Sequence, residues 1–515
     1  MRETLEKLMF ANLFSGTSFL GGLLPEDLIR QLDDLVWGPW LLVLLLGSGC
    51  YLMLRLKFLP LKNLKNALWW AFGGGTKRSP GSKSDGQISA LASLTTELAT
   101  TLGIGNIIGV AMAMVLGGPG ALFWMVVTSV IGMATKLVES MLSVKYRGKN
   151  EKGETAGGPM YTSLHAFPGR AGKALGTLFA MFAVTASFGM GNMTQSNSIA
   201  DALWVSFQIP KADTGLVLTI LTILVVIGGI GIIGRVTQVL VPFMGIFYLL
   251  GATAVIVTHI QNLPGALAGI FVSALHPGAV SGGIFGSITV SAFESLRWGV
   301  SRGIFSNEAG LGAAGITAAA ADTDDCVRQG YISMTGVFLD TVVVCTITGL
   351  AFATSGVLGQ TDSAGNPLTG TALTLAAFET TLGKWGGSFM SICIALFAFA
   401  TVIGWAYQGE KAFEFLLGGR TKYNLWYRFA YGLTAFLGCV CSLEAVWNFS
   451  DICNGLMAVP NLICVLALSG KACREIREYK IPGEYKIPGE YRISGEYRPS
   501  GKRKPTERRK SEKFT

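Results

Sequence analysis

The residues best suited to chemistry lie in the middle of a long apolar stretch, residues 86–115. There the run Thr100–Asn106, TTLGIGN, combines hydroxyls and an amide with two glycines, Gly103 and Gly105. Each glycine costs a helix about 1 kcal/mol relative to alanine, so the run predicts a break. Inside a bilayer, the freed backbone groups are tolerated only where they are buried in protein or line a cavity. Amides at the start of one half-helix suit a carboxylate and carbonyls at the end of the other suit a cation, which predicts a binding site.

A second polar interruption lies in the apolar stretch 298–320. The run Ser306–Glu308 comes shortly before Gly310 and Gly312, which predicts a second broken helix. Broken helices in matching positions of two halves are the best sequence indication of a transporter's substrate site. Residues 310–315 also match the dinucleotide pattern G-x-G-x-x-G. No strand precedes them and they lie inside a membrane span, so we reject that interpretation.

The composition is typical of a polytopic helical membrane protein and not of a soluble domain. Half of the 515 residues are hydrophobic, 14% are charged and the mean hydropathy is +0.48. We therefore expect a multi-pass protein of the cell (inner) membrane, in contact with lipid and without a cleavable signal peptide. The net charge of +9 comes largely from the loops and the tail, so we expect no nucleic-acid partner. The nine cysteines and three histidines lack the spacing of a metal centre, and we expect no metal centre and no cofactor.

The apolar stretches predict an all-α protein with 11 transmembrane helices. Their ranges are 38–56, 88–116, 119–144, 174–204, 215–234, 236–259, 298–320, 330–355, 386–408, 426–443 and 450–469. Loops 55–87 and 145–173 are rich in Lys and Arg, whereas residues 260–296 contain neither. Because cytoplasmic loops are enriched in basic residues, we expect the N-terminus outside and the C-terminus inside (N-out/C-in).

The loop charges also predict two inverted halves. Residues 88–116 run from inside to outside and residues 298–320 run the other way, so the two broken helices begin two five-helix repeats, 88–259 and 298–469. We expect an external N-terminal segment (1–37), an extra transmembrane helix (38–56) outside the repeat, and a cytoplasmic tail (470–515).

Two external connections and the tail complete the chain. In the connections, Leu263–Leu275 and Thr369–Leu382 are either short interfacial helices or ordinary loops. From Glu478 the tail repeats a hexapeptide four times (EYKIPG, EYKIPG, EYRISG, EYRPSG) and ends in a basic run. Lipid contact and simple disorder are the interpretations left open for it.

Several runs in the sequence are shared with a known family. They are ATTLGIGNIIGVA (99–111), GGPG (117–120), GGPMY (157–161), GNM (191–193), RGIFSNEAG (302–310), GWAY (404–407) and NGLMAVPN (454–461). From about residue 38 to 470 the chain resembles the alanine or glycine:cation symporter family, part of the amino acid–polyamine–organocation superfamily. The resemblance implies the five-plus-five inverted-repeat (leucine-transporter-like) fold. The hexapeptide tail lies outside it.

The resemblance also implies roles for residues near the first break. Amides near Thr101, Gly103 and Gly105 correspond to those that hold the substrate carboxylate. The carbonyls of Ala99 and Leu102, together with the hydroxyl of Thr401, correspond to a sodium site, and oxygen ligands suit such a hard cation.

Other polar residues near the breaks have two interpretations each. Thr100 and Thr101 either bind a ligand or bond back to the preceding turn. Asn106 either binds sodium or caps the second half-helix. Gln195 and Asn197 face different ways on a helix, so at most one reaches the site, and we favour Gln195.

At the second break, Phe305, Ser306 and Asn307 are candidates for substrate binding, although an aromatic residue in a span is more often part of the core. Trp405, one turn beyond Thr401, either restricts the pocket to small substrates or anchors the helix at the membrane interface.

Acidic residues inside spans are costly and are therefore functional candidates. Glu97 and Asp340 are possible charge relays. Glu97 either neutralises sodium or carries a proton, or it pairs with Arg297 or Arg302. Glu308 is expected to cap or to pair.

These features predict a secondary active transporter that imports a small neutral amino acid, alanine or glycine, in symport with sodium. Proton coupling and a preference for glutamine are the alternatives within transport. An ion channel is the rival from another class, and the two-break pattern argues against it. We expect no enzyme, because no nucleophile–base pair is evident, and the ATP-binding motif G-x-x-x-x-G-K-[ST] does not occur. The preferred amino acid and the oligomeric state stay open.

Overall fold

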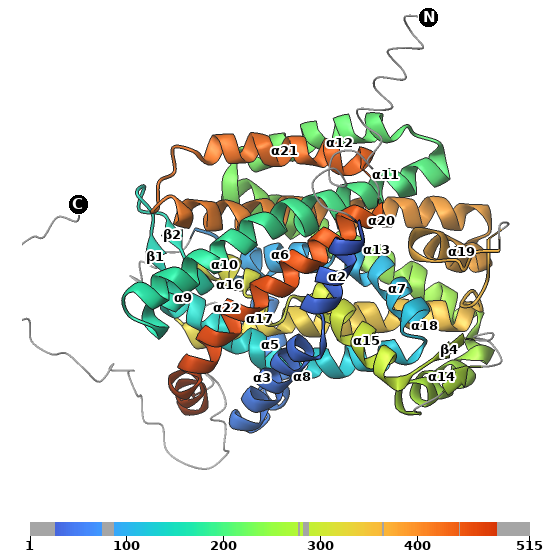
Figure 1. Ribbon diagram of the computed structural model, residues 1–515, viewed down its shortest axis with the longest axis horizontal. Coiled ribbons are helices and arrows are strands. Elements are labelled where there is room, and N and C mark those ends of the chain that lie inside the picture. Colours follow the sequence, from blue (N-terminus) through green and yellow to red (C-terminus); the bar gives the residue numbers. More distant parts are fainter. Residues whose placement is uncertain are drawn as a thin grey trace, which may run out of the picture. The chain divides into compact units, whose positions relative to one another are not determined.

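The computed structural model describes residues 26–74, 87–276, 279–281, 288–362, 365–441 and 443–480 (Figure 1). Within these ranges the chain is predominantly helical. The described residues up to Arg477 form one compact unit. Residues 481–515 lie outside the described residues, so the interpretation of the hexapeptide repeats stays a prediction.

The first broken helix is confirmed. Helix α6 (Ala90–Thr101) begins at Ser89, whose hydroxyl accepts a hydrogen bond from the Ala92 amide at 3.1 Å. After Leu102 the chain leaves the α-helix, makes the short 3₁₀ turn η1 (Ile104–Asn106) and resumes as α7 (Ile108–Leu116).

The second broken helix is confirmed as well. Helix α15 (Ala292–Asn307) ends at Glu308, which has a left-handed φ of 56°. Gly310 and Gly312 have φ values of 92° and 85°, a region that glycine enters without strain, and α16 (Ala313–Ala319) follows.

The remaining elements surround these two broken helices. Before the first break lie α2 (Glu26–Val36), α3 (Pro39–Arg55), α4 (Leu59–Lys62) and α5 (Leu64–Ala71). Between the breaks lie α8 (Gly120–Lys145), β1 (Gly148–Lys149), β2 (Thr155–Ala156), α9 (Pro159–Ala166), α10 (Arg170–Phe188), η2 (Gly189–Met193), α11 (Thr194–Phe207), α12 (Lys211–Val226), α13 (Gly229–Thr258), η3 (Ile260–Asn262), α14 (Leu263–Leu275), β3 (Ala279–Ser281) and β4 (Ile288–Val290). After the second break lie α17 (Cys326–Val337), η5 (Phe338–Cys345), α18 (Thr346–Ser355), α19 (Gly370–Leu382), α20 (Lys384–Leu416), α21 (Asn424–Val440) and α22 (Leu443–Glu478).

Two of these labels mark π-helical turns inside continuous helices, η2 between α10 and α11 and η5 between α17 and α18. The strands form two antiparallel two-stranded ribbons, β1–β2 and β3–β4.

Seven helical stretches in the described residues are long and apolar enough to cross a membrane. They are Gln31–Arg55, Gly120–Lys145, Arg170–Phe207, Gly229–Thr258, Cys326–Ser355, Lys384–Leu416 and Asp451–Glu478. The other predicted spans are interrupted, as at the two breaks, or are short, as α12 and α21 are with 16 and 17 residues. The count of eleven spans therefore stays a prediction.

Some predicted boundaries differ from the structure. The predicted spans 215–234 and 236–259 meet at Arg235, but the helices separate at Gly228 and Gly229, where Gly229 has a φ of 62°. Arg235 lies inside α13 and donates its Nε to the Gly231 carbonyl at 3.1 Å. The glycine pair ends the helix, whereas the charge does not. Helix α22 also continues to Glu478, past the predicted end at residue 469.

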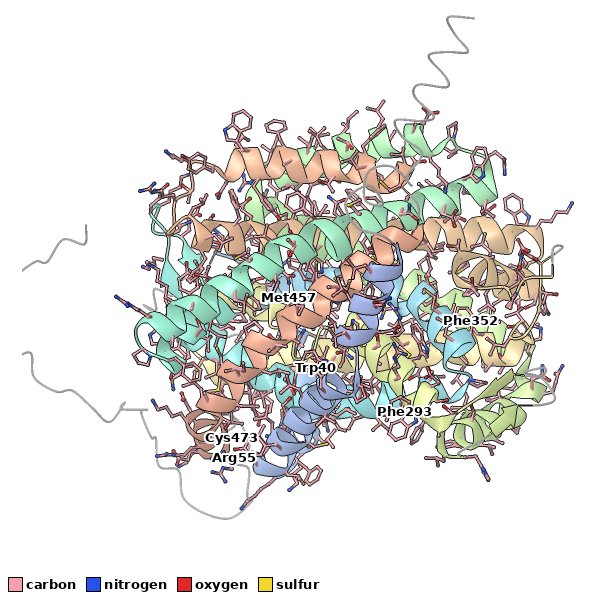
Figure 2. The ribbon with its side chains drawn as sticks, viewed as in Figure 1. Trp40, Arg55, Phe293, Phe352, Met457 and Cys473 are labelled. Carbon is pink, nitrogen blue, oxygen red and sulfur yellow. The ribbon has the colours of Figure 1, made fainter. Side chains whose placement is uncertain are left out.

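The packing brings the two broken helices together. Helix α8 packs against α15, α16 and α17, and α20 packs against α6, α10 and α11. The 3₁₀ turn η1 contacts α15, α20 and η5. At the periphery α12 and α21 lie side by side (Figure 1). Figure 2 shows Arg55 at the end of α3 near Cys473 of α22, and Arg55 donates to Ser469 Oγ at 3.3 Å.

Candidate functional site

The two breaks touch at Gly105. A Cβ atom on Gly105 would lie 3.2 Å from Ser306 Cα and 3.3 Å from Phe305 Cδ1. The other glycine of the first break is equally enclosed, because a Cβ on Gly103 would lie 2.5 Å from Thr401 Oγ1. Both glycines therefore permit close approach of neighbouring elements in addition to weakening the helix.

The end of α6 meets α20 through Thr401. The buried hydroxyl of Thr401 donates to the Ala99 carbonyl at 2.9 Å. Leu102 directly follows the last turn of α6. The structure thus brings Ala99 and Thr401, two of the predicted sodium ligands, into contact.

Asp340 lies between the two breaks. Its Oδ1 accepts from Asn106 Nδ2 at 2.7 Å and its Oδ2 accepts from Ser306 Oγ at 2.8 Å. Thr341 Oγ1 also donates to Oδ2 at 2.7 Å. The carboxylate of Asp340 and the hydroxyl oxygens of Ser306 and Thr341 are the kind of oxygen ligand that hard cations prefer. Asn106 Oδ1 accepts from the Gly103 amide at 3.0 Å, so this side chain also caps the first break.

Sequence reasoning missed two residues of this cluster. Thr341 directly follows Asp340, and its hydroxyl accepts a hydrogen bond from Asn307 Nδ2 at 3.1 Å. The Cys345 thiol lies 3.3 Å from Asn106 Nδ2 and 3.4 Å from Ser306 Oγ. Cys345 lies in an apolar run, and nothing in the sequence indicates that it contacts polar residues. The hydroxyl of Thr341, next to Asp340, could have been recognised from the sequence.

Gln195 reaches the first break, as predicted, and Asn197 does not. Gln195 Oε1 accepts from the Ile104 amide at 3.3 Å. Asn197 instead donates to the carbonyls of Gly438 and Cys441, both at 2.8 Å. The two amides therefore face different ways, and Asn197 has a packing role.

The threonines before the first break bond back to their own helix. Thr100 Oγ1 donates to the Glu97 carbonyl at 2.8 Å and Thr101 Oγ1 lies 3.4 Å from the Leu98 carbonyl. Thr100 Oγ1 also lies 3.4 Å from Glu308 Oε2. The structure thus contains the back-bonded arrangement, and a ligand role for either threonine stays a prediction.

Trp405 belongs to the core. Its side chain is fully buried, its Nε1 donates to Glu308 Oε1 at 2.9 Å, and its ring lies against Gly191. The interpretation as an interfacial anchor was wrong, because the turn beyond Thr401 faces the second break and not the end of the span. Glu308 pairs, as predicted, with Trp405 and Thr100.

Glu97 is buried beside the site without touching it. Its Oε1 accepts from Ser333 Oγ at 2.9 Å and from Ser93 Oγ at 3.4 Å. The two arginines proposed as its partners have other carboxylates: Arg302 pairs with Asp451 at 2.6 Å and Arg297 pairs with Asp34.

Sequence reasoning also missed Lys136 of α8, which is 1% exposed and donates from Nζ to the Asn307 carbonyl at 3.0 Å. A single lysine in the apolar span 119–144 was the available signal.

Comparisons with known proteins agree with this architecture. A sequence model of the sodium:alanine symporter family matches residues 23–486. The sodium/alanine symporter AgcS of Methanococcus maripaludis is 47% identical over 462 residues, which cover 88% of this chain and 98% of AgcS. The probable sodium/glutamine symporter GlnT of Bacillus subtilis is 36% identical over 88% of this chain and 90% of its own length.

A solved structure shares the fold. The crystal structure of MhsT in complex with L-phenylalanine matches with a TM-score of 0.54 at 14% identity, over 76% of this chain and 98% of MhsT. The fold, the apolar helices and the sequence relatives together identify a multi-pass membrane transporter. The chain belongs to the sodium:alanine symporter family, whose members couple the movement of an amino acid to that of a cation.

Proposed function

We propose that this transporter imports alanine or glycine together with sodium by alternating access. The observation that carries the proposal is the meeting of the two broken helices around Asp340, with Asn106 on one side and Ser306 on the other. A buried carboxylate among amide and hydroxyl groups suits a sodium ion.

The substrate then binds beside the cation. Its carboxylate faces the amides near Thr101, Gly103 and Gly105, where the positive end of a half-helix favours an anion. Gln195 and the segment Phe305–Asn307 border the same space.

A second sodium position lies at the end of α6. The carbonyls of Ala99 and Leu102 and the hydroxyl of Thr401 supply its oxygen ligands. Thr401 Oγ1 is 2.9 Å from the Ala99 carbonyl, which leaves the two oxygens close enough to share one ion.

The position of Trp405 supports the proposal that the substrate is small. Its indole is fully buried and donates to Glu308 of the second break, so a substrate bound beside that break has little room on the side of Trp405. A preference for glutamine, which the name of GlnT brings into consideration, requires more room on that side.

The proposal includes a topology. Eleven spans, an N-terminus outside and a C-terminus inside place the two broken helices in opposite directions within a five-plus-five inverted repeat. For each coupled sodium ion, the charge that moves through 100 mV releases about 2.3 kcal/mol. A tenfold sodium gradient adds about 1.4 kcal/mol per ion, so a single coupled ion sustains a substrate gradient of roughly several hundredfold.

Uptake into proteoliposomes tests the proposal. Radiolabelled alanine, glycine and glutamine are offered in turn, each with a sodium, lithium or proton gradient. We expect saturable uptake of alanine and glycine that requires sodium. Uptake driven equally by a proton gradient without sodium, or a higher kcat/KM for glutamine, contradicts the proposal.

Variants localise the second sodium position. Thr401→Val keeps the shape of the side chain and removes its hydroxyl, so we expect a higher sodium requirement. Thr374→Val is the control, because Thr374 is equally buried but bonds only to the Gly370 carbonyl of its own helix, at 2.8 Å. Equal sodium requirements in the two variants remove Thr401 from the cation site.

A further inference from the structure

Three buried polar side chains from neighbouring helices contact the second break. They are Lys136 and Glu139 of α8 and Asn461 of α22. They are 1%, 1% and 2% exposed. Helix α8 packs along both α15 and α16, so its side chains reach the stretch between them. None of the three was a candidate from the sequence.

The first contact is at the end of α15. Lys136 Nζ donates to the Asn307 carbonyl at 3.0 Å. The last carbonyls of a helix have no partner within the helix and carry partial negative charge. An ammonium group at this point therefore satisfies a buried carbonyl and complements the helix end in one contact.

The second contact is inside the non-helical stretch. Asn461 Nδ2 donates to the Gly310 carbonyl at 2.9 Å and to Glu139 Oε2 at 2.8 Å. A Cβ on Gly312 would lie 2.8 Å from Asn461 Cγ, so the glycine lets the backbone approach the amide closely. Glu139 thus orients Asn461, and Asn461 holds the backbone.

Glu139 also links the two contacts. It follows Lys136 by three residues on α8, so the two side chains lie on one face of the helix and interact electrostatically. The Glu139 carboxylate also interacts with the backbone amides of Gly310 and Gly312. Lys136, Glu139 and Asn461 are therefore one connected group that spans residues 307–310.

We propose that Lys136, Glu139 and Asn461 act as positioning residues that fix the second break in its substrate-binding geometry. The proposal rests on the proposed function and adds residues that touch neither substrate nor cation. The group holds Asn307 and Gly310, and the residues just before them, Phe305 and Ser306, face Gly105 and Asp340. A shift of the held backbone moves these side chains directly.

Three variants of differing severity test the proposal in the full-length transporter. Asn461→Asp removes the donor to the Gly310 carbonyl and adds a carboxylate beside Glu139. Lys136→Met removes the donor to the Asn307 carbonyl, whereas Lys136→Arg keeps a cationic donor. Ser140→Ala is the matched control, because Ser140 lies on α8, is fully buried, and has a hydroxyl without a partner among the described residues.

Two measurements separate positioning from folding. The first is the alanine concentration that gives half-maximal sodium-driven uptake in proteoliposomes, and the second is the melting temperature in detergent without substrate. We expect N461D and K136M to raise the half-maximal alanine concentration at least tenfold. K136R should raise it much less than K136M, and S140A should match the wild type.

The double variant Glu139→Gln/Asn461→Asp adds a further check. It exchanges the two groups but leaves the Gly310 carbonyl without a donor, so we expect it to stay defective. Glu139→Gln alone retains an acceptor for Asn461 and is expected to be milder.

Each outcome decides the matter. A lower melting temperature with an unchanged half-maximal concentration in N461D and K136M overturns the proposal, since the group would then only stabilise the fold. If both fail to fold, E139Q decides, and a half-maximal concentration equal to that of S140A overturns the proposal. Absence of sodium-driven alanine uptake by the wild type is a failure of the proposed function itself, seen before any variant is compared.

Discussion

Asn106 and Asp340, which are 234 residues apart in sequence, are joined by a hydrogen bond of 2.7 Å between Nδ2 and Oδ1. The bond connects the first broken helix to the π-helical turn η5, and Ser306 connects the same carboxylate to the second broken helix. The side chain of Asp340, itself on η5, thus links this turn to both broken helices.

Replacement of Asp340 by Asn is expected to impair the response to sodium. The substitution keeps the shape but removes the charge and one acceptor oxygen, and a hydrogen bond to a charged group contributes about 1.5–3 kcal/mol. We therefore expect the sodium concentration for half-maximal alanine uptake to rise by about tenfold or more. The control is Glu379→Gln, which neutralises an exposed carboxylate on α19. A D340N variant with the sodium response of E379Q removes Asp340 from the cation site.

Gly103→Ala is expected to lower the rate of uptake strongly, whereas Gly109→Ala, in the same broken region, is expected to leave it nearly unchanged. At residue 103 the added Cβ would lie 2.5 Å from Thr401 Oγ1, and such overpacking costs roughly 1–3 kcal/mol. At residue 109 the nearest atom is 3.9 Å away, and alanine is favoured in a helix by about 1 kcal/mol. Initial uptake rates in vesicles with matched protein content check this. Equal rates in the two variants would show that the close approach at Gly103 is unimportant.

Replacement of Trp405 by Leu is expected to shift selectivity towards larger amino acids. The change opens space beside Glu308 and removes the indole donor, and differences of one or more methylene groups in a pocket alter selectivity by about tenfold or more. The measurement is the ratio of kcat/KM for glutamine to that for alanine. Trp385→Leu serves as the control because Trp385 is 80% exposed. An unchanged ratio in W405L argues that another residue limits substrate size.

Glu154 is expected to make folding stability depend on pH under acidic conditions. Partial burial raises its pKa, but the hydrogen bond from Asn150 and the nearby ammonium of Lys411 outweigh burial, so the pKa lies below the ordinary 4.5. A carboxyl group with a lowered pKa stabilises the fold above 4.5, and this contribution is lost as the pH falls through the folded-state pKa.

Melting temperatures of the wild type and Glu154→Gln, measured in detergent from pH 7 downwards, check this expectation. The wild type should be the more stable at pH 7, and the difference should shrink below about pH 4.5. A difference that is constant over this range shows that the charge of Glu154 does not contribute.

The sequence predicted those parts of the fold that have local causes. Helix α14 spans Leu263–Leu275, which is the helical one of the two interpretations left open for that stretch, and both helix breaks occur where glycines and polar residues interrupt an apolar run. The boundary between α12 and α13 was misplaced because Arg235 was taken as a loop residue, whereas an arginine on a helix surface satisfies its own donor at a nearby carbonyl.

The residues missed in the site have long-range causes. Lys136, Glu139 and Cys345 are single residues inside apolar spans, and their partners lie on other helices. Nothing within a few residues of each indicates which helix it will face. The spacing of Gln195 and Asn197 predicted only that at most one of them faces the site, and the structure places Gln195 at the first break.

The wide turn η2 (Gly189–Met193) ends two residues before Gln195. One surplus residue in such a turn swings all later side chains by about 100° compared with an uninterrupted α-helix. Gln195 Nε2 donates a hydrogen bond to the carbonyl of Met190, a residue of that turn, at 3.2 Å. A backbone insertion thus sets which face of α11 is presented to the first break, and deletion of a single residue from η2 would turn Gln195 away from Ile104 although every side chain kept its identity.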